Sequence, residues 1–457
     1  MNTFMLAGVS SNVGKTTVTM GVMAALCARG QEVVPFKTGP DYIDPMFHGF
    51  VTGRKSINLD TWMLDQETVR RLFYAKLSEK SVGIAEGVMG LYDGHGVASD
   101  VGSSAYLAKT LGIPVFLIID GRGMSKSAAA MVKGYVDFDP ELNIAGVIIN
   151  KISSEAVYQL LKEMIETYTG VPCVGYFPNC PEIVINSRHL GLIPVDELEG
   201  LRGQVDQAAQ MAEQYIDLDK MLALSVKTAL PALTPDPFEV RAGAYTDLTI
   251  AYARDKAFSF YYEDNFNVLR KLGVKLVPVS PLEDAALPDD IDGFYVGGGF
   301  PEVFGEALEA NRSFRTHLCG ALAAGLPCFA ECGGLMYLTR SMKMLDGARS
   351  QAVGFLEADT RMTKRLQRFG YVEVTANFAG RSIPIRAHEF HHSLVEAEGL
   401  KTCYSIVKGK RSWRCGYVKK HTLAGYPHIH FYSNPEFLFA LLDVARAVKA
   451  GDDPCVG

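Results

Sequence analysis

Short apolar runs that alternate with helical segments constrain the fold of this chain most strongly. The runs are rich in Val, Ile or Phe and occur at residues 3–8, 33–37, 82–86, 115–120, 144–150 and 171–176. Most of the segments between them have a helical pattern, such as residues 16–29 and 99–111. Continuous apolar strands that alternate with helices predict a parallel sheet covered by helices on both faces.

Residues 225–246 interrupt this alternation. They hold three prolines and show little periodicity, which favours a linker. A second series of strands and helices begins at residues 248–252. The predicted organisation is therefore an α/β domain at residues 1–224, a linker at 225–246 and a second α/β domain at 247–457.

Composition narrows the class of protein. The chain has 457 residues, of which 48% are hydrophobic and 21% are charged, as is ordinary for a soluble protein of two or three domains. A net charge of -6 argues against nucleic acid as the main partner, because a surface that binds phosphates usually needs a basic excess. Nine cysteines without CxxC spacing disfavour a disulfide framework and a structural zinc site, and favour the reducing cytoplasm. We find no signal peptide and no apolar stretch of about 18 residues, so no membrane segment is expected.

The segment between the first strand and the first helix has the features of a phosphate loop. Successive backbone N–H groups at a helix N-terminus form an anion site, where Lys15 can contact the terminal phosphates and the Thr16 hydroxyl can ligate Mg²⁺. Gly8 lies one position earlier than in the usual spacing, and the longer loop is similar to that of dethiobiotin synthetase and the MinD/ParA ATPases. The alternative is a simple Gly/Ser turn before a helix. The residues expected to bind nucleotide are Gly8, Ser11, Asn12, Val13, Gly14, Lys15, Thr16 and Thr17.

Two acidic residues near the ends of the second and third strands are candidate magnesium ligands. Asp41 follows the second strand, and Glu86 ends the third. Both are expected at the carboxyl edge of the sheet, where open α/β folds bind ligands. Together with Thr16 they predict a Mg²⁺ site, because Mg²⁺ prefers hard oxygen ligands. Helix caps or solvated loop residues are the alternative interpretation of these acids.

The second domain contains a cysteine in the context of a nucleophile elbow. An apolar strand runs directly into Cys332, Gly333 and Gly334, and a helical pattern follows. Such a sharp turn exposes a reactive side chain, and the helix N-terminus is expected to favour the thiolate. Cys328 lies inside the strand and is interpreted as a small core residue.

A thiolate nucleophile needs a base, and histidines are concentrated in two stretches, 388–392 and 425–431. In the second stretch His428 and His430 alternate with apolar residues, so a strand would place both on one face, as suits a base and the partner that orients it. A zinc site is the alternative, although clear further ligands are missing. Backbone N–H groups of Gly298, Gly299 and Gly333 are candidates for an oxyanion hole.

These motifs together resemble the cobyrinic acid a,c-diamide synthase family, which includes the hydrogenobyrinic acid and nickel-sirohydrochlorin a,c-diamide synthases. The resemblance covers nearly the whole chain and also rests on residues 37–45, 86–94, 187–192, 253–258, 297–302 and 330–334. It implies an α/β fold with an N-terminal phosphate-loop domain like that of dethiobiotin synthetase, built on a parallel sheet. It also implies a C-terminal α/β domain like a class I glutamine amidotransferase.

The resemblance implies a mechanism with two sites. Cys332, with His428 as base, would release ammonia from glutamine. His430 falls where many relatives in the wider superfamily carry glutamate, so a Cys–His dyad is an alternative to a triad. At the N-terminal site, ATP with Mg²⁺ would phosphorylate a substrate carboxylate, and ammonia would attack the acyl phosphate. Residues matched to the substrate site are Asp93, Arg188 and His189.

The implied substrates are glutamine and a tetrapyrrole-derived polycarboxylic acid. We favour cobyrinic acid and retain hydrogenobyrinic acid and nickel-sirohydrochlorin as alternatives. The basic run Arg361, Lys364, Arg365 and Arg368 is a further candidate for binding the macrocycle, or else a solvated helix face. The resemblance admits a homodimer. A MinD/ParA-like switch ATPase is the alternative of another class, but it gives Cys332 no role.

Overall fold

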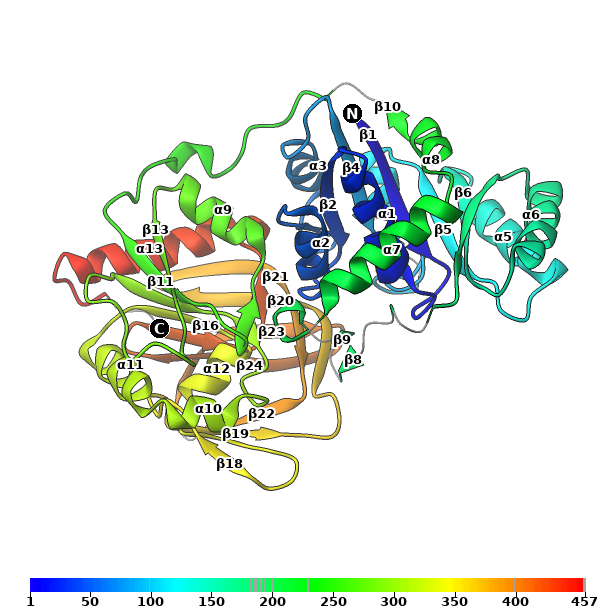
Figure 1. Cartoon of the computed structure of the whole chain (residues 1–457). Helices are drawn as coiled ribbons and strands as arrows, with labels where there is room; N and C mark the ends of the chain where they lie inside the picture. The colour runs from blue at the N-terminus through cyan, green and yellow to red at the C-terminus, as the bar shows by residue number, and fades with distance from the viewer. Residues whose placement is uncertain are drawn as a thin grey trace. The chain divides into compact units, whose positions relative to one another are not determined.

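The computed structural model describes residues 1–97, 99–180, 183, 187–188, 191–192, 194–198, 200–227, 230–397 and 399–454. The chain divides into two compact units, Met1–Thr234 and Pro235–Gly457, both visible in Figure 1. The division falls inside residues 225–246, the predicted linker. Parts of that segment belong to the units themselves, since Val226–Lys227 forms a strand of the first unit and Phe238 is buried in the second. None of the helices in the described ranges is long and apolar enough to cross a membrane.

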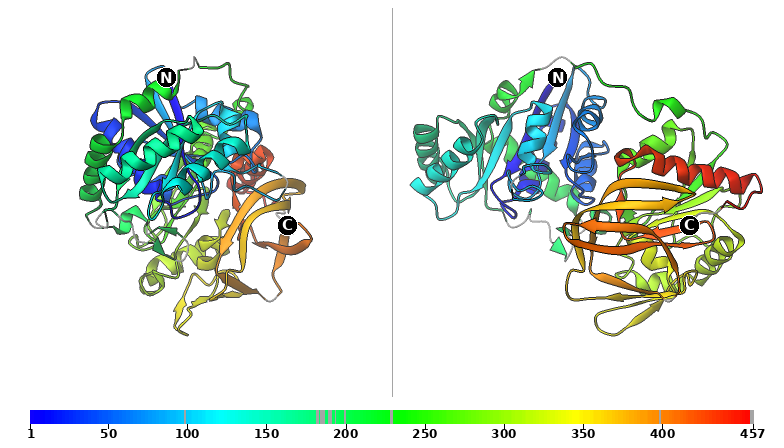
Figure 2. Two further views of the ribbon diagram at one scale, coloured as in Figure 1. Left: turned by 90° about the vertical axis from the view of Figure 1, so that its right-hand side faces the viewer. Right: turned by 180° about the vertical axis from the view of Figure 1, so that it is seen from behind.

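The first unit is built on a parallel sheet with the strand order β3-β2-β4-β1-β5-β6-β7, and β10 pairs with β1 in the antiparallel direction. Every neighbouring pair along that order is parallel, as predicted. The strands are β1 (Asn2–Gly8), β2 (Glu32–Thr38), β3 (Ile57–Leu59), β4 (Ser81–Glu86), β5 (Val115–Asp120), β6 (Ile144–Ile152), β7 (Cys173–Pro178) and β10 (Val226–Lys227). Their continuous burial explains the unbroken apolar runs, because helices lie on both faces of the sheet (Figures 1 and 2).

Side-chain caps begin several helices of this unit, for example Asp65 for α3, Ser103 for α4 and Ser154 for α6. Helix α1 differs, because the left-handed Gly14 precedes it and no side chain caps it. The first N–H groups of a helix have no partner within the helix, so α1 presents its N-terminus to an anion. The helices are α1 (Lys15–Ala28), α2 (Asp44–Thr52), α3 (Gln66–Tyr74), α4 (Ser104–Leu111), α5 (Lys126–Phe138), α6 (Glu155–Thr169), α7 (Leu201–Tyr215) and α8 (Leu218–Leu224).

The second unit has a ten-stranded sheet with the order β13-β11-β14-β16-β25-β24-β23-β20-β21-β26. The strands from β13 to β25 are parallel, and those from β25 to β26 are antiparallel. The strands are β11 (Thr249–Ala253), β13 (Lys275–Val279), β14 (Gly293–Val296), β16 (Cys328–Glu331), β20 (Arg368–Phe378), β21 (Arg381–His391), β23 (Lys401–Lys408), β24 (Arg411–Lys419), β25 (Thr422–Gly425) and β26 (His428–Ile429).

Helices and smaller sheets complete this unit. The helices are α9 (Glu263–Lys271), α10 (Gly305–Ala310), α11 (Arg312–Ala324), α12 (Gly333–Leu338) and α13 (Pro435–Lys449). The short strands β12 (Phe258–Phe260) and β15 (Gly298–Gly299) pair with each other. A separate sheet has the order β18-β17-β19-β22, formed by β17 (Ser341–Lys343), β18 (Arg349–Gln351), β19 (Ala358–Met362) and β22 (Ser393–Ala397).

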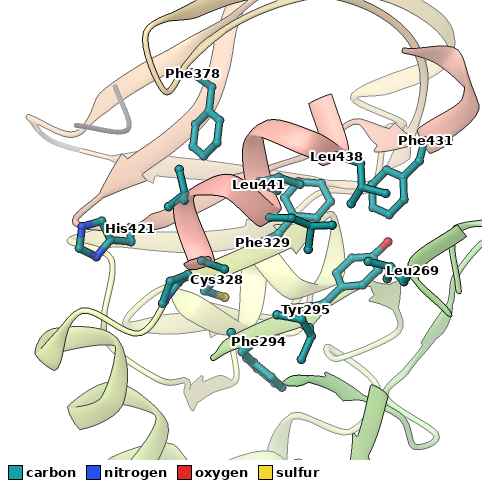
Figure 3. A pocket seen from close by; sticks show the side chains of 16 residues that line it. Leu269, Phe294, Tyr295, Cys328, Phe329, Phe378, His421, Phe431, Leu438 and Leu441 are labelled. Atoms are coloured by element: carbon teal, nitrogen blue, oxygen red, sulfur yellow. The ribbon is translucent and has the colours of Figure 1, made fainter. Parts of the chain in front are cut away.

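An apolar cavity of about 50 Å³ lies between α13 and the central strands of the second unit (Figure 3). Phe294, Tyr295 and Phe329 line it from the sheet, and Leu438 and Leu441 line it from α13. Cys328 also lines this cavity and is buried, as predicted for a core residue. Cys332 does not line the cavity, so this pocket is a packing feature separate from the elbow at the end of β16.

Candidate active site

The phosphate loop lies between β1 and α1 and is braced by β6. Asn150 on β6 donates a hydrogen bond of 2.6 Å to the carbonyl oxygen of Val13. Gly14 has a φ of 91°, and a Cβ atom there would lie 2.2 Å from Nδ2 of Asn150. Only glycine therefore permits both the left-handed turn and the close approach of Asn150.

Lys15 spans the mouth of this loop. Its Nζ donates hydrogen bonds to the carbonyl oxygens of Ser10, at 2.9 Å, and of Met89, at 2.6 Å. Burial, and then the positive charge of Lys37, lower the pKa of Lys15 to about 8. An ammonium group held by neutral carbonyls beside another cation gains stability from an anion, so this loop fits the terminal phosphates of a nucleotide.

Glu86 at the end of β4 contacts the start of α1, next to the phosphate loop. Its Oε1 accepts hydrogen bonds from the Thr16 hydroxyl, at 2.9 Å, and from Nζ of Lys37, at 3.1 Å. Its Oε2 lies 2.7 Å from Nε2 of His48. Burial opposes ionisation of this carboxyl, but Lys37 and His48 hold its pKa below the usual range. Thr16 and Glu86 are thus adjacent oxygen donors next to the phosphate site, as a Mg²⁺ site requires.

The side chain of Asp41 binds backbone groups at the start of α2. Its Oδ1 accepts the backbone N–H groups of Ile43, at 2.8 Å, and Asp44, at 3.1 Å. Asp41 therefore fixes the turn that leads into α2, although Ile43 and not Asp41 occupies the N-cap position. Its Oδ2 lies 4.0 Å from Nζ of Lys37, so Asp41 still faces the buried charges. Its metal role stays a prediction.

Sequence reasoning assigned no role to Lys37 or His48, which are both buried in this network. Nζ of Lys37 lies 2.7 Å from Oδ2 of Asp44, and Nδ1 of His48 lies 3.1 Å from Oγ of Ser56. Burial would lower the pKa of Lys37, but the Asp44 and Glu86 carboxylates keep it above its ordinary value. The signal for Lys37 was a charged residue at the end of an otherwise apolar strand, β2, which pairs with the strand that carries Glu86. His48 gave no comparable signal.

The predicted substrate residues are only partly described. Oδ2 of Asp93 accepts the N–H of Gly90 at 2.7 Å, and its charge acts on Lys15, which places Asp93 near the phosphate loop. Arg188 lies in β8 (Ser187–Arg188), which pairs with β9 (Gly191–Leu192). His189 lies outside the described residues.

The basic run at residues 361–368 is not a helix face, and that interpretation is wrong. Arg361 belongs to strand β19 and pairs with Glu396 at 2.8 Å. Arg368 begins β20, and its guanidinium lies 4.7 Å from the ring centroid of Trp413. The residues between these strands have no helical hydrogen bonding, so the run does not lie on a helix.

Cys332 occupies a strained turn between β16 and α12, as predicted for an elbow. Its φ is 49° and its ψ is -102°, unusual values for a residue other than glycine. Its N–H donates to the carbonyl oxygen of Gly425 at 2.8 Å. Burial, and then the charge of Glu302, raise the pKa of the thiol. The N–H of Gly333 at the start of α12 lowers this pKa, as expected for a helix N-terminus, but burial of the sulfur outweighs it.

The strand β15 contacts both the base candidate and the residue after the nucleophile. A Cβ atom at Gly298 would lie 2.5 Å from Cε1 of His428, so the imidazole packs directly on this glycine. A Cβ atom at Gly333 would lie 3.1 Å from the backbone nitrogen of Gly299. The structure therefore brings together Cys332, His428 and the three glycines predicted to form an oxyanion hole.

His428 is a neutral imidazole in this environment. Burial, followed by the neighbouring His388 and His391, lowers its pKa to about 3. His388 lies directly opposite His428 where β21 pairs with β26. A neutral imidazole is the form that accepts a proton from a thiol, so the electrostatics suit His428 as a base.

Among the residues that the structure describes, His430 makes no hydrogen bond that would orient His428. It is fully buried, and neither of its ring nitrogens has a hydrogen-bond partner among the described residues. Its ring lies 4.9 Å from that of Tyr262 and 5.9 Å from that of Tyr432. Its catalytic role stays a prediction that this geometry does not favour. In the described ranges, no group of three His, Cys, Asp or Glu side chains could hold a metal ion.

His391 is a second functional candidate that sequence reasoning did not single out. Its Nδ1 lies 2.8 Å from the carbonyl oxygen of Ser393, and its ring stacks on Tyr426 with centroids 3.7 Å apart. Burial lowers the pKa of His391 to about 4, so the ring is neutral and Nδ1 carries the proton. Its buried Nε2 is then an acceptor without a hydrogen-bond partner in the described chain.

A phosphate loop on one unit and a cysteine elbow facing a histidine on the other define a nucleotide-binding domain joined to a glutamine amidotransferase domain. Residues 4–191 match the CobQ/CobB/MinD/ParA nucleotide binding domain, and residues 249–436 match the CobB/CobQ-like glutamine amidotransferase domain. The chain belongs to the cobyrinate a,c-diamide synthase family, which confirms the resemblance found in the sequence.

Three relatives, each named cobyrinate a,c-diamide synthase, show the extent of the match. The protein from Listeria innocua is 42% identical, and the alignment covers 98% of this chain and 100% of the relative. The protein from Streptococcus sanguinis is 45% identical over 98% of this chain and 99% of the relative. The protein from Salmonella typhimurium is 43% identical over 97% and 98%. A MinD/ParA-like switch ATPase, the alternative of another class, does not account for the chain, because residues 249–436 match a glutamine amidotransferase domain.

Proposed function

We propose that this chain amidates the a and c acetate carboxylates of cobyrinic acid, with glutamine as nitrogen donor and ATP as the source of activation. The proposal rests on the presence of two sites in one chain. The first is a phosphate loop beside Thr16 and Glu86, and the second is an amidotransferase elbow at Cys332 near His428. Relatives that match over nearly the whole chain carry the name cobyrinate a,c-diamide synthase. The homodimer and the cytoplasmic location stay predictions.

At the elbow, His428 accepts the thiol proton as the sulfur of Cys332 attacks the carboxamide carbon of glutamine. N–H groups of Gly298, Gly299 and Gly333 stabilise the oxyanion that develops on the carboxamide oxygen. His428 returns the proton to the departing nitrogen, which leaves as ammonia. Water then hydrolyses the thioester, which yields glutamate and the free thiol.

The acceptor Nε2 of His391 supports a place for glutamine beside this pair. His391 is close enough to His428 to lower its pKa. A buried acceptor without a partner costs free energy unless a donor arrives. Glutamine brings two kinds of N–H donor, its carboxamide and its ammonium, and either would satisfy this nitrogen. We assign His391 to the binding of glutamine.

At the phosphate loop, ATP with Mg²⁺ supplies the phosphoryl group that turns a carboxylate oxygen into a leaving group. Lys15 and the N-terminus of α1 would bind the phosphates, and Thr16, Glu86 and Asp41 would hold the metal ion. Asp93 lies near Lys15 and, with Arg188 and His189, is assigned to the substrate carboxylates. Ammonia attacks the acyl phosphate carbon, and inorganic phosphate leaves with the C–O bond electrons. Ammonia must be unprotonated to act as the nucleophile, which favours its release in a place sheltered from water.

A comparison of the three macrocycles as separate substrates tests this assignment. The full chain is incubated with ATP, Mg²⁺ and glutamine and with cobyrinic acid, hydrogenobyrinic acid or nickel-sirohydrochlorin, and products are analysed by mass spectrometry. We expect two carboxylate-to-amide conversions on cobyrinic acid, with the highest kcat/KM of the three. A higher kcat/KM for another macrocycle would contradict the substrate assignment, and no amide on any of them would contradict the function.

A further inference from the structure

The carboxylate of Glu331, immediately before the nucleophile, joins three strands of the second unit. Its Oε2 accepts a hydrogen bond of 2.6 Å from the hydroxyl of Tyr295 on β14. Its Oε1 accepts a hydrogen bond of 2.7 Å from the backbone N–H of Ile429 on β26. Ile429 directly follows His428, so one buried side chain connects the peptide beside the base to the peptide beside the nucleophile.

Strand β26 needs such a connection because its own pairing is minimal. It consists of His428 and Ile429, and it pairs only with β21 in the described ladder, at Ala387 and His388. A two-residue ladder cannot by itself fix the position of a strand to the accuracy that proton transfer requires.

Side chains hold both polar groups of the Ile429 backbone. Nδ2 of Asn265 on α9 donates to the carbonyl oxygen of Ile429 at 2.8 Å, and Oδ1 of Asn265 accepts the N–H of Phe431 at 2.8 Å. Glu331 holds the N–H of Ile429 from the other side. Asn265 is fully buried and Glu331 nearly so, so water does not compete for these bonds.

We propose that Glu331 is a positioning residue that fixes the backbone of His428 relative to Cys332. This inference rests on the proposed roles of Cys332 and His428. In a triad, an acidic side chain orients the base through the imidazole ring. Here the acid acts one covalent step away, on the peptide that follows the base. His430, at the position of the usual acid, makes no hydrogen bond to any residue that the structure describes.

Two variants at this position separate geometry from charge. Glu331→Gln keeps an oxygen acceptor for the Ile429 N–H, and its amide can donate to the hydroxyl of Tyr295. Glu331→Ala leaves the Ile429 N–H and the Tyr295 hydroxyl buried without their acceptor. Tyr295→Phe is the matched control, because it removes the other partner of Glu331 and leaves the bond to Ile429 in place.

The experiment measures glutaminase kcat and KM in the full chain, together with the pH dependence of Cys332 alkylation by iodoacetamide. We expect Glu331→Ala to lower kcat about 100-fold, the size of effect caused by a displacement of about 1 Å, with a smaller change in KM. Its alkylation profile should lose the contribution of the neighbouring imidazole. Glu331→Gln and Tyr295→Phe should stay within about tenfold of the wild type. All variants should retain amidation with ammonium salts, which reports an intact first unit.

Wild-type kcat and an unchanged alkylation profile in Glu331→Ala would overturn the inference. Equal damage in Glu331→Gln and Glu331→Ala would also overturn it, because charge rather than position would then be responsible. If Glu331→Ala does not fold, Asn265→Ala replaces it, since it removes the opposite support of Ile429 and should also lower kcat. A wild-type chain without any glutaminase activity would instead refute the proposed function itself.

Discussion

The hydroxyl of Thr16 donates a hydrogen bond of 2.9 Å to Oε1 of Glu86, which links the first turn of α1 to the end of β4. The same carboxylate oxygen accepts Nζ of Lys37 at 3.1 Å. The Thr16 hydroxyl on α1 and the Lys37 ammonium on β2 therefore both contact the buried, ionised carboxylate of Glu86. This arrangement makes Glu86 the strongest candidate for holding a metal ion beside the phosphates.

Glu86→Gln should lower amidation with either nitrogen source by about 100-fold or more, because it removes the negative charge opposite the metal. Glutaminase activity at Cys332 should remain. The measurement is amidation as a function of Mg²⁺ concentration. Asp41→Asn is the matched variant, and it should have a smaller effect because an amide oxygen can still accept the N–H groups of Ile43 and Asp44. A larger effect of Asp41→Asn than of Glu86→Gln would contradict this ranking.

Lys15 should make nucleotide binding depend on pH. In the free protein, burial and Lys37 lower its pKa to about 8, and bound phosphates favour the charged form and raise the pKa again. ATP affinity should therefore be constant below pH 8 and fall by up to about tenfold per pH unit above it. Calorimetry between pH 7 and 9 measures this slope. Lys15→Ala should bind weakly without the slope, and an equal slope in that variant would assign the titration to another group.

Gly298→Ala should damage the glutaminase site specifically. The added Cβ would lie 2.5 Å from Cε1 of His428, so the imidazole must move, and kcat for glutamine hydrolysis should fall by about 100-fold. Gly320→Ala on α11 is the matched control, because no atom beyond the neighbouring backbone of its own helix lies within 4 Å of its added Cβ. It should keep full activity and stabilise the helix by up to about 1 kcal/mol. Unaltered glutamine hydrolysis in Gly298→Ala would show that His428 does not act from this position.

His430→Phe tests whether His430 orients the base. Within the described part of the chain, the ring of His430 makes no hydrogen bond and packs near Tyr262 and Tyr432, so an aromatic ring without nitrogen should be tolerated. Glutaminase kcat should stay within about tenfold of the wild type, whereas His428→Ala should lose activity. If both variants lost activity to the same degree, a triad that includes His430 would be supported.

The parallel sheet of the first unit and the elbow at Cys332 were predictable because each has a pattern within a short stretch of sequence. Buried parallel strands are continuously apolar, and an elbow is a strand followed directly by small residues and a helix. The antiparallel half of the second sheet, from β24 to β26, was not specified, because strand order depends on contacts between distant residues.

The parts of the site that sequence reasoning missed are long-range contacts. The bond from Lys37 to Glu86 joins residues 49 positions apart, and that from Ile429 to Glu331 joins residues 98 positions apart. The periodicity of the sequence does not indicate which distant residues contact one another. The raised pKa of the Cys332 thiol was also missed, because desolvation depends on the surrounding fold and outweighs the effect of the helix N-terminus that the sequence suggested.

The central claim is that a thiol in one unit releases the ammonia that a nucleotide-dependent reaction in the other unit consumes. Cys332→Ala tests it directly, with amide-¹⁵N glutamine and with ¹⁵N ammonium as alternative donors to cobyrinic acid in the presence of ATP and Mg²⁺. We predict that the variant transfers no ¹⁵N from glutamine but forms the labelled diamide from ammonium at close to the wild-type rate. Loss of amidation from both donors, or undiminished transfer from glutamine, would contradict it.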